Sequence, residues 1–387
     1  MSVPVLYPSF TSIWAGQETA RPTGYLADAI SCSVTQELNG EYSLTMTIRY
    51  DAPHASKTDM DIGDWILAPN CDHCGELNST MGEEWQPFRI ERIDKNIDGI
   101  LTIYAVHISY MLNRLAVYPF SASSLAGALA KIEDNYMTTM YTTWFSYSTN
   151  ISSSVPYKSL KPRSVRNLLA GEEGSIVDVY GQGELELITY AVRLKAPAVV
   201  DRGLTIIRGK NMTKENITDD RTNYTAAIVP FWYGDVNVNG AVKKKLVMGS
   251  TSGTPTDTSY IVNVGSYDWA IPVDVTDKFS EEPTAAEVRS AGQTWLSVNK
   301  PYDTEPTIKI SFGSTWQLSA SRSPYVLLRL GDTITVSDPR YGLIGNNGKF
   351  RVQKLTYDVL RDRYTSIEVG KLSPSLYKTI RKVAKGG

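Results

Sequence analysis

Residues 31–51, SCSVTQELNGEYSLTMTIRYD, contain the pattern that decides the fold. After Asn39-Gly40, apolar and polar side chains alternate strictly from Tyr42 to Tyr50, which is typical of a β-strand with one buried face. Asn and Gly are residues that tolerate the positive φ angles of a type I′ turn. We therefore predict a β-hairpin with Asn39 and Gly40 at its tip, in a role that is structural and not chemical.

The remaining elements follow from periodicity and from capping residues. Apolar side chains at helical spacing after Ser124 predict a helix within 121–137, and a second helix is expected over 164–169. The capping-box pattern Thr284-Ala-Ala-Glu287 predicts a helix near 284–298. The Thr-, Asn- and Gly-rich region 210–270 is expected to form loops joined by short strands. Further strands are expected near 65–68, 88–94, 99–107, 185–194, 204–208 and from 307 to 369.

Two parts of the chain repeat the same order of features. Ile62-Gly-Asp-Trp-Ile66 followed by Phe88-Arg-Ile-Glu-Arg-Ile93 parallels Leu330-Gly-Asp-Thr-Ile334 followed by Phe350-Arg-Val-Gln-Lys-Leu355. A further strand-like stretch comes after each pair. The turns of the two repeats are Gly63-Asp64 and Gly331-Asp332. An internal repeat constrains the architecture more strongly than any single element.

The predicted fold class is therefore mainly β with α+β parts. Two similar antiparallel β-barrel-like domains are separated by α+β and loop-rich segments. We predict a first β-barrel-like domain at 1–115, an α+β domain at 116–200, a loop-rich β segment at 201–300, a second β-barrel-like domain at 301–370 and a basic tail at 371–387.

Composition excludes several classes of function. The 387 residues include 41 acidic and 39 basic side chains, a formal net charge of −2 that argues against dominant nucleic-acid binding. No apolar run approaches the ~18 residues of a membrane helix, and the amino end lacks a signal-peptide pattern. We expect synthesis in the cytoplasm without membrane insertion. Charge is nevertheless uneven, because residues 1–115 hold 15 acids and 7 bases, whereas 371–387 hold five bases and no acid.

Motifs for catalysis or for cofactors are incomplete. Gly203 and Gly209-Lys210-Asn211 suggest a phosphate loop, but five residues separate the glycines and Asn replaces the expected Ser or Thr, so a strand end with a glycine turn is the better interpretation. Cys71-Asp-His73-Cys74 has zinc-like spacing but no fourth ligand nearby, although Cys32 or His54 could approach in space. His-Glu-x-x-His and Gly-x-Ser-x-Gly are absent from the sequence. We predict no catalytic residue, no cofactor and no bound metal.

The order of several short segments resembles a known family. Glu37-Leu-Asn-Gly-Glu-Tyr-Ser-Leu44 resembles the amino-terminal hairpin of phage minor structural proteins in the prophage endopeptidase-tail group. The chain as a whole resembles the tail-associated lysin, or tail-hub, family of long-tailed phages and is similar to the hub protein of T-even contractile phages. The other matching segments are 164–169, 174–178, 183–186, 201–203, 209–211, 283–291, 330–332 and 358–364.

That resemblance implies a structural hub of the distal tail in the virion. Members of the family form homotrimers whose two β-barrel-like domains per chain make a pseudo-sixfold ring, which matches the sixfold tail to threefold tip parts and lets the genome pass. The implied partners are the distal tail protein ring, the tape-measure protein and tip fibre or receptor-binding proteins, and DNA is expected to pass without specific binding. Many members continue into a peptidoglycan-degrading domain, whereas this sequence ends with 371–387, so we carry over no catalytic residue and expect no enzyme.

Two alternatives remain at this point. A tail-associated cell-wall hydrolase would need a nucleophile or metal set. A carbohydrate-binding receptor adhesin would use exposed aromatic side chains, for which Trp232-Tyr233, Trp269 and Trp316 are the candidates, although they could equally be buried anchors at an interface.

The acidic excess in 1–115 leads to one further expectation for the hub. Basic side chains would retain a passing duplex, so a conduit benefits from acidic walls. Asp59, Asp61 and Asp64 are candidates to face the channel or its mouth, and the alternative is that they only keep the outer surface soluble. Helix-like spacing in the tail 371–387 would direct its bases toward an acidic partner or along the same ring.

Overall fold

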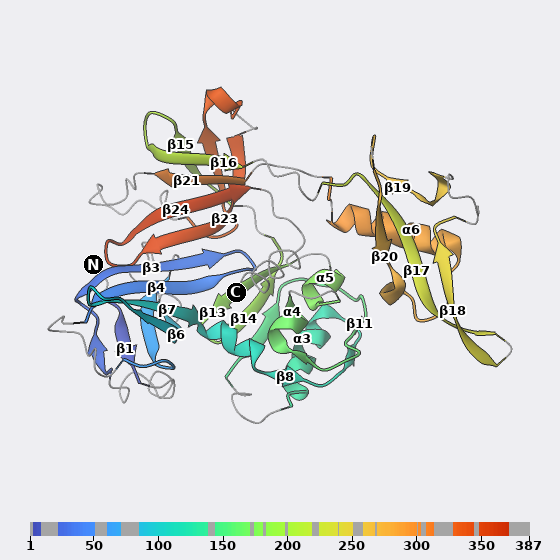
Figure 1. Ribbon diagram of the computed structural model, residues 1–387, viewed down its shortest axis with the longest axis horizontal. Coiled ribbons are helices and arrows are strands. Elements are labelled where there is room, and N and C mark those ends of the chain that lie inside the picture. The colour runs from blue at the N-terminus through green and yellow to red at the C-terminus, as the bar shows by residue number, and fades with distance from the viewer. Residues whose placement is uncertain are drawn as a thin grey trace. The chain divides into compact units, whose positions relative to one another are not determined.

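The structure is a computed structural model that describes part of the chain's residues. These are 3–8, 22–50, 60–70, 85–137, 144–170, 174–180, 183–197, 200–218, 224–238, 240–250, 258–267, 269–299, 301–302, 307–312, 328–343 and 348–370. The chain divides into two compact units, one built from residues up to Ile217 and from Thr307 onward, the other from the segment between them (Figure 1).

The first repeat is an antiparallel sheet within the first unit. Its alternating sequence buries one face, with Tyr42, Leu44, Met46 and Ile48 almost fully covered. The short strands β1 (Val5–Tyr7) and β2 (Gly24–Tyr25) extend the sheet beyond its last strand. In spatial order the strands are β3 (Ala29–Glu37), β4 (Tyr42–Arg49), β7 (Ile100–His107), β6 (Trp85–Lys95) and β5 (Trp65–Pro69).

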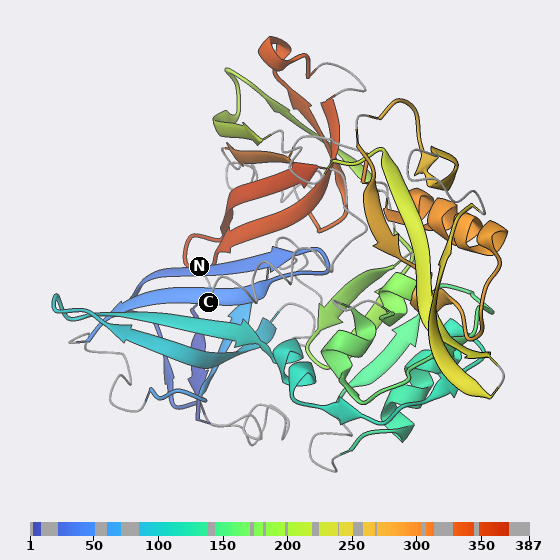
Figure 2. The same ribbon diagram turned by 45° about the vertical axis from the view of Figure 1, so that its right-hand side comes forward.

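The second repeat has the same spatial order of strands. β15 (Asp201–Ile207) departs from the first repeat, because it pairs with the last strand in parallel. The repeats join where the fourth strand of the second pairs with β3, so that one 13-stranded sheet runs through both (Figure 2). The predicted mainly β class is confirmed. The strands are β16 (Met212–Thr218), β21 (Thr307–Phe312), β24 (Arg363–Gly370), β23 (Lys349–Asp358) and β22 (Thr333–Ser337).

An α+β segment follows the first repeat and completes the core of the first unit. Ser124 caps the first α-helix through its side chain, which accepts a hydrogen bond from the Gly127 N–H at 3.1 Å, and Ser164 caps the next helix in the same way. The elements are η3 (Ile108–Asn113), β8 (Ala116–Val117), β9 (Ser121–Ala122), α3 (Leu125–Asp134), β10 (Ser146–Thr149), β11 (Tyr157–Lys158), β12 (Arg163–Ser164), α4 (Val165–Leu169), α5 (Ile176–Tyr180), β13 (Glu184–Ile188) and β14 (Ala191–Lys195).

The second unit is more regular than the sequence suggested. Where loops and short strands were expected, β17 (Ala227–Val238) has 12 residues and pairs with β18 (Ala241–Met248). The apolar side chains of β17 pack against α6 (Ala285–Asn299), whose start is the predicted capping box: the Thr284 N–H donates to Glu287 Oε2 at 2.7 Å. The short elements are η4 (Thr258–Tyr260), β19 (Val262–Asn263), β20 (Ile271–Asp274) and η5 (Thr276–Lys278).

Candidate functional site: the seam between the two repeats

The two Gly-Asp turns have the same hydrogen-bonded geometry. Asp64 Oδ2 accepts from the Asp61 N–H at 2.8 Å, and Asp332 Oδ2 accepts from the Arg329 N–H at 2.9 Å. Both carboxylates belong to buried residues, 9% and 4% exposed. A short acidic side chain three residues after the donor closes such a turn, which explains why Asp follows Gly in both repeats.

The glycines of these turns bond to the same strand in each repeat. The Gly63 N–H donates to Ile90 O and the Gly331 N–H donates to Val352 O, both at 2.9 Å. Both glycines have positive φ, 103° and 86°, which other residues rarely adopt.

Each repeat also has a bulge at the same point of its Phe-Arg strand. The register shifts between Ile90 and Arg92 in β6 and between Val352 and Lys354 in β23. Bulges are placed by specific local sequence, so a shared bulge beside a shared turn indicates that the two repeats are equivalent at the level of the backbone.

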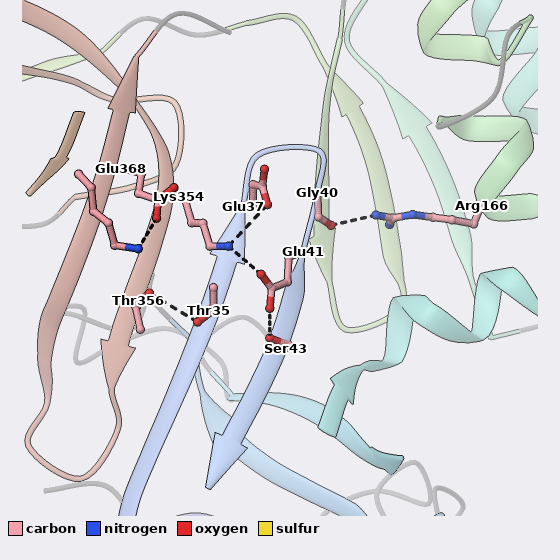
Figure 3. Close-up of polar contacts among 10 residues, drawn as sticks. Thr35, Glu37, Gly40, Glu41, Ser43, Arg166, Lys354, Thr356 and Glu368 are labelled. Atoms are coloured by element: carbon pink, nitrogen blue, oxygen red, sulfur yellow. Dashed lines mark hydrogen bonds and ion pairs between the residues drawn. The ribbon is translucent and has the colours of Figure 1, made fainter. Parts of the chain in front are cut away.

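The seam between the repeats is an antiparallel ladder of β23 on β3. Lys354 faces Glu37 and Thr356 faces Thr35, whose hydroxyl oxygens are 3.5 Å apart (Figure 3). Lys354 Nζ lies 2.7 Å from a Glu41 carboxylate oxygen and 3.8 Å from Glu37.

Electrostatics hold the charged pair of the seam in its ionised form. Partial burial acts to raise the pKa of Glu41, but hydrogen bonds from Lys354 and from Ser43 outweigh it, and the pKa is lowered. Burial acts to lower the pKa of Lys354, but its contacts with Glu41 and Glu37 outweigh that effect and the pKa is raised. The ion pair therefore stays charged across the neutral range, and because both groups are only half-buried its contribution to stability is modest.

The hairpin tip of β3 and β4 contacts the α+β segment. The Asn39 side chain bridges to the start of β13, because Nδ2 donates to Gly183 O at 3.1 Å and Oδ1 accepts from the Leu185 N–H at 2.5 Å. Arg166 on α4, a buried residue, donates from Nη2 to Gly40 O at 3.0 Å (Figure 3). The Asn39 side chain and the Gly40 carbonyl therefore connect the hairpin tip to the α+β segment.

The turn itself is not the type I′ turn that the sequence suggested. Asn39 has a φ of 58°, but Gly40 is not in the positive-φ region, whereas a type I′ turn requires positive φ at both central residues. The turn starts one residue earlier than expected: the Gly40 N–H donates to Glu37 O at 3.0 Å, so Leu38 and Asn39 are its central residues.

The second repeat also contacts the α+β segment, through a different ion pair. Arg351 Nε donates to Gly331 O at 2.8 Å, and its Nη2 pairs with Glu184, the first residue of β13. Burial raises the pKa of Glu184 although Arg351 opposes that effect. β13 therefore contacts both repeats, Asn39 from the first and Arg351 from the second.

His107 is the last residue of β7 and lies beside the start of β4, at the same end of the first repeat as the hairpin tip. Its ring stacks on Tyr42 with centroids 4.1 Å apart, Nδ1 accepts from the Ser109 N–H at 3.3 Å, and Nε2 lies 3.0 Å from Gln86 Oε1. This is a neutral ring with its proton on Nε2. Burial first, and the charge of Arg166 second, lower its pKa well below the ordinary 6.5. His107 is thus a structural residue at a strand end.

The acids that were expected to face a channel differ in their exposure to solvent. Asp61 is exposed and available to solvent. Asp64 is buried and its carboxylate is used inside the turn, so it does not meet the expectation of a solvent-facing acid. Asp59 and the tail 371–387 lie outside the described residues.

The aromatic residues expected of an adhesin differ in their exposure to solvent. Trp232 is 3% exposed and packs in the core of the second unit, so it cannot stack on a sugar. Tyr233 and Trp269 are exposed, 52% and 58%. Trp316 lies outside the described residues.

The remaining motif residues form no catalytic or metal site within the described ranges. Cys71, His73, Cys74 and His54 lie outside those ranges, and Cys32 is buried. Within the ranges, no group of three or more His, Cys, Asp or Glu side chains could hold a metal ion, and no helix is long and apolar enough to span a membrane. The segment 203–211 is the end of β15 followed by a turn in which Gly209 has a φ of 79°.

Sequence reasoning missed the side chains that connect the hairpin tip and the repeats to the α+β segment. Arg166 occupies a position between buried apolar residues of a five-residue helix, and Glu184 starts a strand that alternates regularly. An Arg among apolar neighbours is the signal that could have identified Arg166 as a contact residue, because a buried guanidinium requires hydrogen-bond acceptors. Nothing in the pattern around Glu184 distinguishes it from a solvated strand end.

No protein-family model and no curated protein sequence matches the chain, but its fold is similar to those of three solved tail proteins. Prophage tail protein gp18 from Listeria monocytogenes EGD-e is 14% identical with a TM-score of 0.55, and the match covers 99% of both chains. The 43 kDa tail protein of prophage MuSo2 from Shewanella oneidensis is 12% identical with a TM-score of 0.57, covering 97% of this chain and 99% of the other. A tail protein from Neisseria meningitidis MC58 is 9% identical with a TM-score of 0.54, covering 97% and 98%. The resemblance drawn from the sequence is confirmed at the level of the fold.

Proposed function

We propose that this chain is a structural hub protein of the distal phage tail, which forms a homotrimeric ring, adapts the sixfold tail to threefold tip parts and lets the genome pass. The observation that carries the proposal is the equivalence of the two repeats in turn, register and bulge. Three chains with two equivalent repeats each would present six equivalent surfaces.

The tail-protein fold over nearly the whole chain supports the same proposal. The partners that it implies are the distal tail protein ring and the tape-measure protein on one side and tip fibre or receptor-binding proteins on the other. The place of action is the virion, after synthesis in the host cytoplasm.

The decisive measurement is the number of subunits in an assembled tail tip, by mass of the native particle or by image reconstruction. Three copies with alternating repeats around a channel are expected. Six copies, or a ring that uses one repeat of each chain, would refute the proposal.

The channel wall is proposed to be acidic, with Asp61 among the contributing residues. The exposed position of Asp61 and the excess of acids in 1–115 support this. An electrostatic map of the assembled ring with a neutral or positive lumen would leave the acids with solubility as their only role.

The hydrolase and adhesin alternatives are weaker. The described residues offer no metal cluster, and among them His107 is buried and kept neutral by that burial and by the charge of Arg166. A zymogram on purified cell walls is expected to show no clearing, and a cleared band would establish the hydrolase. For the adhesin, burial of Trp232 removes one of the candidate stacking residues, and glycan-array binding would favour that alternative.

A further inference from the structure

The seam inside the chain shows how one repeat binds another. β23 bonds along its first half to β22 and along its second half, residues 354–358, to β3, while β24 lies on its other side. The Leu38 N–H donates to Gln353 O at 2.8 Å and the Val359 N–H donates to Cys32 O at 2.9 Å, so the second half of β23 provides a docking edge for the first strand of the other repeat.

The equivalent edge in the first repeat is β6. Its first half bonds to β5 through residues 85–89, its bulge matches that of β23, and Arg92 takes the place of Lys354. On the side away from β7, no strand in the described ranges pairs with residues 91–95. The side chains of Arg92 and Asp94 are 61% and 45% exposed.

Backbone direction along β6 shows which groups this edge offers. The Asn96 N–H donates to Ile100 O at 3.0 Å, toward β7. Because successive residues of a strand bond to opposite sides, the N–H groups of Ile93 and Lys95 point toward the open edge. Unpaired groups of this kind are a template for another strand.

The strand of the second repeat that corresponds to β3 is β16. It is the neighbour of β21 in the sheet, as β3 is the neighbour of β4, and in the described ranges it is the last strand of the sheet on that side. Residues Thr213, Lys214 and Asn216 along it are exposed. The edges left open by the two repeats are therefore the counterparts of the two edges that meet in the seam.

We propose that, in the trimer, residues 92–95 of β6 form an antiparallel ladder with β16 of the neighbouring subunit, as the equivalent residues 354–357 of β23 do with β3 within the chain. The proposal rests on the proposed trimeric hub and identifies the surfaces that close its ring. Six ladders, three within chains and three between them, would make the sheet continuous around the ring.

The first test compares Lys95→Pro with Lys95→Ala. Both remove the same charge, but only proline removes the N–H that points to the open edge. We expect Lys95→Ala to trimerise like the wild-type chain and Lys95→Pro to have a trimer dissociation constant raised by about tenfold or more, as the loss of an interfacial hydrogen bond predicts. Equal trimerisation of the two variants by sedimentation would overturn the ladder.

The second test does not depend on how proline affects the folding of β6. Asp94→Cys is combined in turn with Lys214→Cys and with Asn216→Cys in the full chain, and the single Asp94→Cys variant is the control. Oxidation is expected to give covalently linked trimers with at least one pair and none with the control. Wild-type trimers whose paired variants never crosslink would refute this ladder and leave the hub standing, whereas a wild-type chain that never trimerises in an assembled tail tip would refute both.

Discussion

Replacing Asn39 by glycine removes both hydrogen bonds that connect the β3–β4 hairpin tip to the α+β segment. Glycine keeps the positive φ of 58° without strain, so the change isolates the side chain. The bonds lost are those to Gly183 O and from the Leu185 N–H. At about 0.5–1.5 kcal/mol for each bond, the free energy of unfolding should fall by about 1–3 kcal/mol.

The assay is urea unfolding followed by circular dichroism, together with amide hydrogen exchange at Leu185, whose protection should fall selectively. Asn39→Ala is the matched variant, because it loses the same bonds and also strains a left-handed backbone, for a further cost of about 1 kcal/mol. If Asn39→Gly unfolds within about 0.5 kcal/mol of the wild-type chain and Leu185 stays protected, the tip does not dock as described.

Three further outcomes are expected. Because the folded state holds His107 neutral while its unfolded pKa is the ordinary 6.5, the unfolded chain binds the extra proton, and lowering the pH from 7.5 to 5.5 should cost about 1.4 kcal/mol of stability in urea melts, a slope that His107→Gln should flatten. Thr284→Ala should lower the stability of the second unit by about 1 kcal/mol in thermal unfolding, with Thr284→Ser close to wild type. Asp64→Ala and Asp332→Ala should each cost about 1–3 kcal/mol in urea melts, and losses that differ severalfold, or that fail to add in the double variant, would contradict the equivalence of the two turns.

The sequence predicted the parts of the fold that depend on local patterns. Strict alternation located β4, capping residues located α3 and α6, and the paired Gly-Asp turns revealed the duplication. Each of these signals lies within a few residues of the structure that it specifies, so no knowledge of distant contacts is needed.

The features that the sequence did not predict depend on contacts between distant segments. The turn at Asn39 differs from type I′ because its side chain bonds to β13, 144 and 146 residues away. The length of β17 was missed because the Thr, Asn and Gly residues of this region suggested loops. The seam could not be predicted for the same reason, since Lys354 and Glu41, which form its ion pair, are 313 positions apart in the sequence.

Along the chain, the second unit is inserted into the second repeat at the connection that corresponds to the Asn39 turn of the first. β3 and β4 are joined by a tight turn, whereas the equivalent strands β16 and β21 are joined by the whole segment from Thr218 to Pro306. A hairpin tip lies outside the ladder, so an insertion there leaves the strand register intact. In the trimer that we propose, the strands would therefore supply six equivalent positions, whereas the inserted units would supply three. Because only one of the two repeats carries the insertion, the same ring could bind sixfold partners through its strands and threefold partners through its inserted units.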